Sequence, residues 1–137
     1  MRPKKVILCV DDDELELSVL KFMLATNGYR VVCAASAAEA TAVFAAEPVD
    51  LVTVSGKLPG TGAALVEQLK GIKPYVGMIL FSDPGSDGGA FADAVICRRS
   101  CPTVDLLERI KIMSERKRGS RKRAQQVAAP ELSTVST

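Results

Sequence analysis

The stretch that decides the fold of this chain is DLVTVSGKLPG, residues 50–60. Val49 to Val54 form a short, nearly continuous apolar run, and the Pro-Gly pair at positions 59 and 60 is typical of a loop. An earlier apolar run, Lys5 to Val10, leads directly into the three acids Asp11 to Asp13. Both runs predict short buried strands that end in polar residues.

Helix signals follow these strands. Asp13 with Glu16, and Ser36 with Glu39, have the spacing of capping boxes, so each pair predicts a helix start. In the first helix we expect one buried apolar stripe at positions i, i+4, i+7 and i+8, formed by Leu15, Val19, Phe22 and Met23. In the other helices we expect buried faces formed by Ala40, Val43 and Phe44, by Leu65, Val66 and Leu69, and by Leu106, Leu107, Ile110 and Met113.

Further short apolar runs predict strands at residues 30–34, 76–81 and 95–98. Strands that alternate with helices through short loops indicate a parallel sheet covered on both faces. Five such units predict an α/β fold, the flavodoxin-like doubly wound five-stranded parallel sheet of order 2-1-3-4-5. Residues 82–94 contain three glycines and a proline. We therefore expect the fourth helix of this pattern to be truncated or missing.

The chain divides into two regions of opposite charge. Residues 1–114 hold 12 lysines and arginines against 14 acids, whereas residues 115–137 hold 6 against 2. We expect a folded domain over 1–114 and a basic, disordered tail over 115–137. No apolar run is long enough to cross a bilayer, and no export signal is visible, so we expect a cytoplasmic protein with reduced cysteines.

The acids after the first strand and the strand-loop stretch at 50–60 resemble the receiver domain of two-component response regulators, over about residues 4–114. In that family, two acids after the first strand hold Mg²⁺, and these match Asp11 and Asp12. The phosphoacceptor aspartate matches Ser55, the switch hydroxyl matches Ser82, and the lysine that pairs with the phosphoryl group matches Arg99. Ser100 stands where the family has proline, and Ile96 where it has an aromatic residue.

These departures indicate a degenerate pseudo-receiver that lacks the phosphoacceptor aspartate. A serine hydroxyl needs a neighbouring base to become a nucleophile, and the chain contains no histidine. We expect Asp11 and Asp12 to hold Mg²⁺ weakly or to be the vestige of a magnesium site, with no other cofactor. We expect no enzymatic activity.

The sequence therefore predicts a stand-alone, receiver-like protein of bacterial phosphorelay signalling. It would bind protein partners, either a kinase or a downstream signalling protein, without being switched by phosphorylation. One alternative is attachment to nucleic acid or another anionic surface through the basic run at 116–123. A second alternative is a conventional receiver phosphorylated at another acid, for which Asp50 and Asp83 are the candidates. Asp50 begins the third strand, so we expect it at the opposite edge of the sheet, whereas Asp83 follows Ser82 and is nearer the site.

Overall fold

The computed structural model describes residues 4–56, 62–82, 92–97 and 100–115. Strands and helices alternate from the first strand to the fourth, as predicted. The elements are β1 (Val6–Val10), α1 (Glu14–Thr26), β2 (Arg30–Ala34), α2 (Ala37–Ala46), β3 (Leu51–Ser55), α3 (Gly62–Ile72), β4 (Gly77–Phe81), β5 (Ala94–Ile96) and α4 (Thr103–Glu115).

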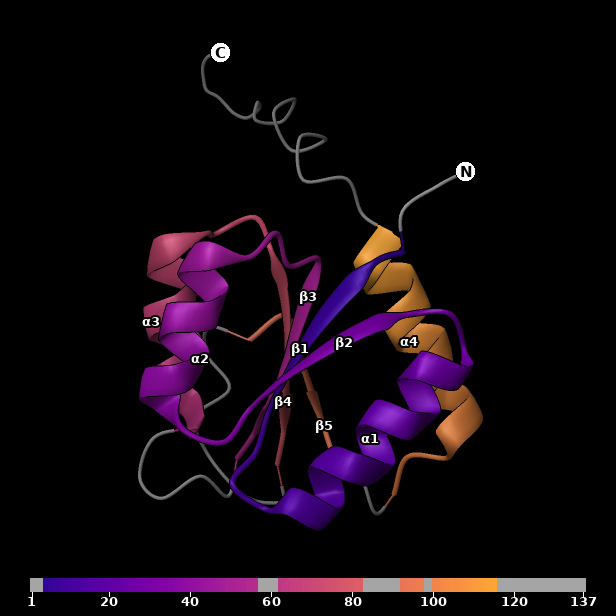
Figure 1. The fold of residues 1–137 in the computed structure, drawn as a ribbon. Helices are drawn as coiled ribbons and strands as arrows, with labels where there is room; N and C mark the ends of the chain where they lie inside the picture. Colours follow the sequence, from indigo (N-terminus) through magenta and orange to yellow (C-terminus); the bar gives the residue numbers. More distant parts are fainter. Residues whose placement is uncertain (1–3, 57–61, 83–91, 98–99, 116–137) are drawn as a thin grey trace.

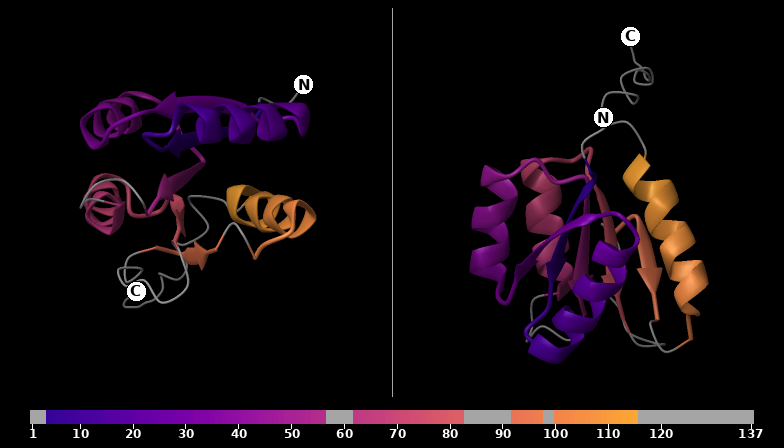
Figure 2. Two further views of the ribbon diagram at one scale, coloured as in Figure 1. Left: turned by 90° about the horizontal axis from the view of Figure 1, so that it is seen from below. Right: turned by 45° about the vertical axis from the view of Figure 1, so that its right-hand side comes forward.

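The five strands form one parallel sheet of order β2-β1-β3-β4-β5, which confirms the predicted topology. Helices α1 and α4 cover one face, and α2 and α3 cover the other (Figures 1 and 2). The segment expected to carry a shortened helix lies mostly in residues 83–91, outside the described residues. The predicted tail, from residue 116 on, also lies outside them, and its role stays a prediction.

Two hydrophobic clusters hold the layers together, one on each face of the sheet. Side chains of α2 and α3 pack on alternate residues of β1, β3 and β4, with Leu8, Phe44 and Leu69 fully buried. On the other face, the side chains of α1 and α4 pack on the intervening residues, with Ile7 and Ile110 fully buried. This alternation follows from the two-residue period of a strand.

The predicted inner faces of α2, α3 and α4 are confirmed. Their largest contributions to the core come from Phe44, Leu65, Leu69 and Ile110, and Val43 and Leu107 are partly buried against the same clusters. The capping signals are confirmed as well. Asp13 accepts the backbone N–H groups of the first turn of α1, and the Ser36 side chain accepts the N–H of Glu39.

The predicted inner face of α1 is wrong. Leu17, Leu20 and Leu24 point into the core, whereas Leu15, Val19 and Phe22 are 72%, 51% and 75% exposed; Met23 is partly buried. Both sets of residues follow helical spacing, so periodicity alone could not choose between them. The structure buries the face with three leucines and leaves a second apolar face outside.

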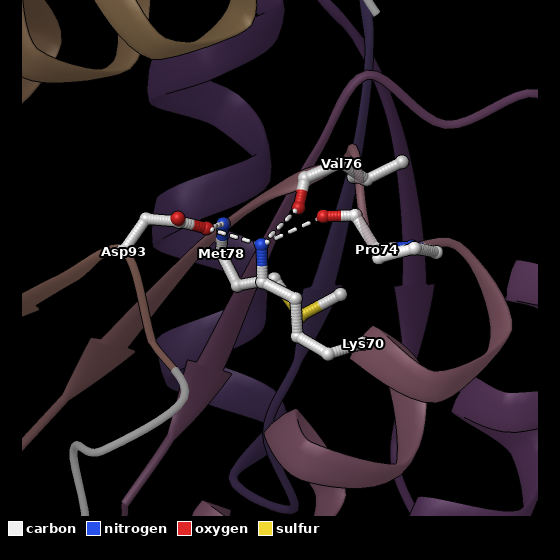
Figure 3. Close-up of polar contacts among 5 residues, drawn as sticks. All are labelled: Lys70, Pro74, Val76, Met78 and Asp93. Carbon is white, nitrogen blue, oxygen red and sulfur yellow. Dashed lines mark hydrogen bonds and ion pairs between the residues drawn. The ribbon is translucent and has the colours of Figure 1, made fainter. Parts of the chain in front are cut away.

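An ion pair joins α3, β4 and β5 at the amino edge of the sheet (Figure 3). The ammonium of Lys70 lies 2.7 Å from Asp93 Oδ2 and donates to the backbone oxygens of Pro74 and Val76 at 3.2 and 3.0 Å. The same Asp93 oxygen accepts the N–H of Met78 at 2.8 Å. Because an ammonium has three donors, this arrangement satisfies the lysine completely.

Among the helices that the structure describes, none is both long and apolar enough to cross a membrane.

Candidate functional site

The carboxyl ends of β1 and β3 bring Asp11, which follows β1, to the level of Ser55, the last residue of β3. Val10 is the register partner of Val54. Asp11 and Ser55 each come one residue later, so they lie at the same level on neighbouring strands. Ser55 pairs in turn with Phe81, and Phe81 pairs with Ile96. The parallel sheet thus places Asp11, Ser55, Phe81 and Ile96 in one row across its edge.

Ser55 is the last residue of β3 and is only 7% exposed. The place is the one that the receiver resemblance implies for the phosphoacceptor. A serine offers a single neutral hydroxyl there, where an aspartate would offer two oxygens and a negative charge. The end of β3 therefore presents a buried neutral hydroxyl and not a carboxylate.

Two glycines allow the main chain to approach closely on either side of Ser55. The N–H of Gly56 donates to the backbone oxygen of Phe81 at 2.6 Å, and a Cβ on Gly56 would lie 2.6 Å from that same oxygen. A Cβ on Gly62, the first residue of α3, would lie 2.8 Å from the backbone oxygen of Ser55. Both positions need glycine because backbone approaches them too closely for a side chain.

The three acids after β1 have different environments. Asp13 caps α1, as predicted. Asp11 is partly buried, and its Oδ1 accepts the N–H of Asp13 at 3.0 Å. Burial raises the pKa of Asp11 above its ordinary value; the hydrogen bond from Asp13 opposes this, and the neighbouring carboxylates add to it. Asp12 is exposed.

The donor set fits a divalent cation only in part. Asp11 and Asp12 can offer hard carboxylate oxygens, which Mg²⁺ prefers, but Ser55 offers no third charge. Within the described ranges, no group of three or more histidine, cysteine or acidic side chains could hold a metal ion. The residues are thus compatible with a weakly held, largely hydrated Mg²⁺.

The opposite side of the site is built by the ends of β4 and β5. The N–H of Ser82 donates to the backbone oxygen of Ile96 at 3.0 Å, which extends the pairing of these strands by one residue. Ile96 is partly buried in the cluster beneath α1 and α4. Ser100 lies in an exposed turn, in which its N–H donates to Cys97. Arg99, the predicted counterpart of the family lysine, lies outside the described residues.

The alternative acid Asp50 lies far from this edge. It precedes β3, and its side chain accepts the N–H of Val6 at 2.8 Å, at the amino end of β1. This confirms its predicted place at the opposite edge of the sheet. Asp83, the other alternative, lies outside the described residues.

Sequence reasoning missed the roles of Gly56 and Gly62. The Pro-Gly pair at 59 and 60 indicated a loop, but the close approach of Gly62 to Ser55 is a tertiary contact that no local signal predicts. Reasoning from the residues also did not foresee that Phe81 would be the neighbour of Ser55 on β4. The apolar run 76–81 together with the strand order would have allowed that inference only once the register was known.

Comparison with known proteins agrees with this geometry. The family model of the response regulator receiver domain matches residues 7–95. The transcriptional regulatory protein AruR of Pseudomonas aeruginosa is 37% identical over 82 residues, which are 56% of this chain and 33% of AruR. The chain therefore corresponds to about one third of that relative's length.

Solved structures show the same fold. A CheY-like receiver domain protein from Methanospirillum hungatei is 33% identical, with a TM-score of 0.76 over 82% of this chain and 95% of its own. The response regulator TrrA of Thermotoga maritima, crystallised in complex with Mg²⁺ and BeF, is 26% identical, with a TM-score of 0.72 over 80% and 98%. This chain belongs to the response regulator receiver domain family, whose members act in two-component signalling.

Proposed function

We propose that this protein is a receiver module that binds protein partners without being switched by phosphorylation. The proposal rests on one observation: Ser55 is buried at the end of β3, where a receiver needs a carboxylate. Its partners would be a sensor kinase or a downstream signalling protein. In this role it transfers no group and is not an enzyme.

The chemistry of serine supports this proposal. A carboxylate is already ionised at neutral pH, whereas a serine must lose its proton to a base as it attacks phosphorus. The chain has no histidine, and the acid at the level of Ser55 is Asp11, a carboxylate that is a weak base. A single oxygen also cannot carry a phosphoryl group and coordinate a metal ion in the way that two carboxylate oxygens can.

Magnesium enters the proposal as a weak ligand. Asp11 and Asp12 are the residues that would hold it, because their oxygens follow β1 at the edge where Ser55 ends β3. Bound there, the ion would lower the repulsion among three consecutive acids. It would not restore a phosphoacceptor.

The test is incubation of the full chain with Mg²⁺ and acetyl phosphate, followed by intact mass measurement. We expect no phosphoryl adduct, while a conventional receiver in the same buffer labels. The matched control is Ser55→Ala, which removes the hydroxyl and keeps a small side chain.

Each kind of adduct would contradict the proposal in a different way. A hydroxylamine-labile adduct on both wild type and Ser55→Ala would reveal an acyl phosphate on an acid, and peptide mapping would name it. A stable adduct on wild type that Ser55→Ala abolishes would make Ser55 itself the phosphoacceptor.

A further inference from the structure

Two cysteines lie at the same level on neighbouring strands of the sheet. Strands β1 and β2 run side by side (Figure 1), and Cys9 of β1 is the register partner of Cys33 of β2. Both side chains are on the same face: Cys9 belongs to the buried cluster beneath α1 and α4, and Cys33 packs against that cluster. Neither cysteine forms a disulfide in the structure. The register of the sheet thus brings two thiols together.

The spacing of the strands suits a covalent link between these thiols. Neighbouring strands lie about 4.7–4.9 Å apart, and the two Cα atoms of a disulfide are about 4.4–6.8 Å apart. The Cβ atoms of a disulfide are closer, at about 3.5–4.5 Å, so the strands would have to approach each other by up to about 1 Å. Strand β2 has room for this movement, because in the described sheet it is an edge strand bonded only to β1.

The two thiols differ in their access to solvent. The side chain of Cys9 is fully buried, whereas Cys33 is partly exposed, so a reagent from solution meets Cys33 first. Burial raises the pKa of the Cys33 thiol; the positive charge of Lys21 opposes this, and the negative charge of Glu39 adds to it. Only a small fraction of Cys33 is therefore thiolate at neutral pH, and we expect its reactions to be slow.

The surroundings of the pair do not supply a metal site. A structural zinc ion takes four ligands from cysteine, histidine or acidic side chains. Within the described ranges, no group of three or more such side chains could hold a metal ion. The chemistry left to two adjacent thiols is their oxidation to a disulfide.

We propose that Cys9 and Cys33 form a reversible disulfide between β1 and β2 when the protein meets a low-molecular-weight disulfide such as oxidised glutathione. The Cys33 thiolate attacks one sulfur of the reagent, which gives a mixed disulfide and releases one thiolate. The sulfur of Cys9 loses its proton and then attacks the sulfur of Cys33, which releases the second thiolate. Two protein thiols are oxidised, one reagent disulfide is reduced to two thiols, and these take up the two protons of the cysteines.

The bond should be easy to reduce again. Its formation pulls β2 away from its position in the reduced sheet, and a disulfide formed under such strain is reduced more readily than a relaxed one. We therefore expect an excess of reduced glutathione to restore both thiols. The proposal needs neither phosphorylation nor metal, so it is independent of the function proposed above.

The test is incubation of the full chain with oxidised glutathione at about pH 8, where more of the thiol is ionised, over a period on the order of hours. Intact mass measurement should show the loss of two hydrogen atoms. Tryptic mapping without reductant should join the peptides 6–21 and 31–57, which contain Cys9 and Cys33. In urea, where the sheet is lost, this pair should have no preference over other pairs of cysteines.

Substitutions separate the roles of the two thiols. Cys9→Ala should stop the reaction at a mixed disulfide with one glutathione on Cys33, whereas Cys33→Ala should leave the buried Cys9 unmodified in the folded protein. The control is the double variant Cys97→Ser with Cys101→Ser, which removes the other two thiols of the chain. It should form the bridge at the wild-type rate. Circular dichroism checks that each variant is folded.

Three results would overturn the proposal. The folded wild type could keep its mass, or keep one glutathione on Cys33, which would show that Cys9 cannot reach its neighbour. The bridge could form as fast in urea as in native buffer, which would mean that the sheet does not position the thiols. The joined peptides could be those of Cys97 and Cys101 alone, which would place the oxidised pair after β5.

Discussion

The ion pair between Lys70 and Asp93 should be a main support of the amino edge of the sheet. Replacement of Lys70 with methionine keeps most of the apolar stem but removes the ammonium. Asp93 then loses a partner at 2.7 Å, and the backbone oxygens of Pro74 and Val76 lose their lysine donor. Asp93 would keep the hydrogen bond from Met78.

The burial of the pair sets the size of the effect. The side chains of Lys70 and Asp93 are 18% and 31% exposed, so water reaches the abandoned carboxylate only in part. Breaking a fully buried pair costs about 3–5 kcal/mol, and an exposed pair contributes about 1 kcal/mol or less. We expect Lys70→Met to lower the free energy of unfolding by about 2 kcal/mol, between these limits.

Urea unfolding of wild type, Lys70→Met, Asp93→Asn and the double variant would measure this loss and the coupling between the two residues. We expect a coupling energy of about 1–2 kcal/mol and a Tm about 8 °C lower for Lys70→Met. Arg30→Met is the control, because Arg30 lies 3.8 Å from Glu47 in an exposed pair and should cost less than about 0.5 kcal/mol. Equal effects of Lys70→Met and Arg30→Met would refute the reasoning.

Two further predictions concern the site. Burial raises the pKa of Asp11 in the folded protein, so at a pH above that pKa the ionised carboxylate destabilises the folded state. Asp11→Asn removes this charge and should therefore raise the free energy of unfolding at neutral pH in metal-free buffer. The gain should vanish in acid, where the carboxyl group is protonated in both states, and equal urea midpoints of wild type and variant at neutral pH would contradict the prediction. Gly62→Ala should destabilise the fold by about 1–3 kcal/mol, because its Cβ would lie 2.8 Å from the Ser55 oxygen. Gly71→Ala is the control: a Cβ there meets nothing within 4 Å, so it should be neutral or stabilise α3 by up to about 1 kcal/mol; equal losses would argue against the close approach.

Local signals in the sequence were sufficient for the topology. Each strand is a short apolar run, and the caps at Asp13 and Ser36 mark where α1 and α2 begin, so the sequence indicated how strands and helices follow one another. Placement of Asp11 and Ser55 at one edge followed from the same pattern, because parallel strands all end on the same side. The confirmed position of Asp50 at the other edge has the same origin.

Features that depend on tertiary packing could not be predicted in this way. Helix α1 is apolar on two faces, and only the packed structure shows that Leu17, Leu20 and Leu24 are the buried ones. Lys70 and Asp93 are 23 residues apart and meet only because α3 returns to the start of β4 and β5. No local sequence pattern predicts such a contact.

The backbone conformation at the end of β3 is held by main-chain contacts and does not depend on the side chain at position 55. Gly56 N–H bonds to Phe81, and Gly62 packs on the backbone oxygen of Ser55; these contacts use only main-chain atoms of residues 55 and 56. They fix the backbone of residues 55 and 56 with any small side chain at position 55. A single substitution there would therefore change the charge and hydrogen-bonding capacity at the end of β3 while these main-chain contacts stay in place.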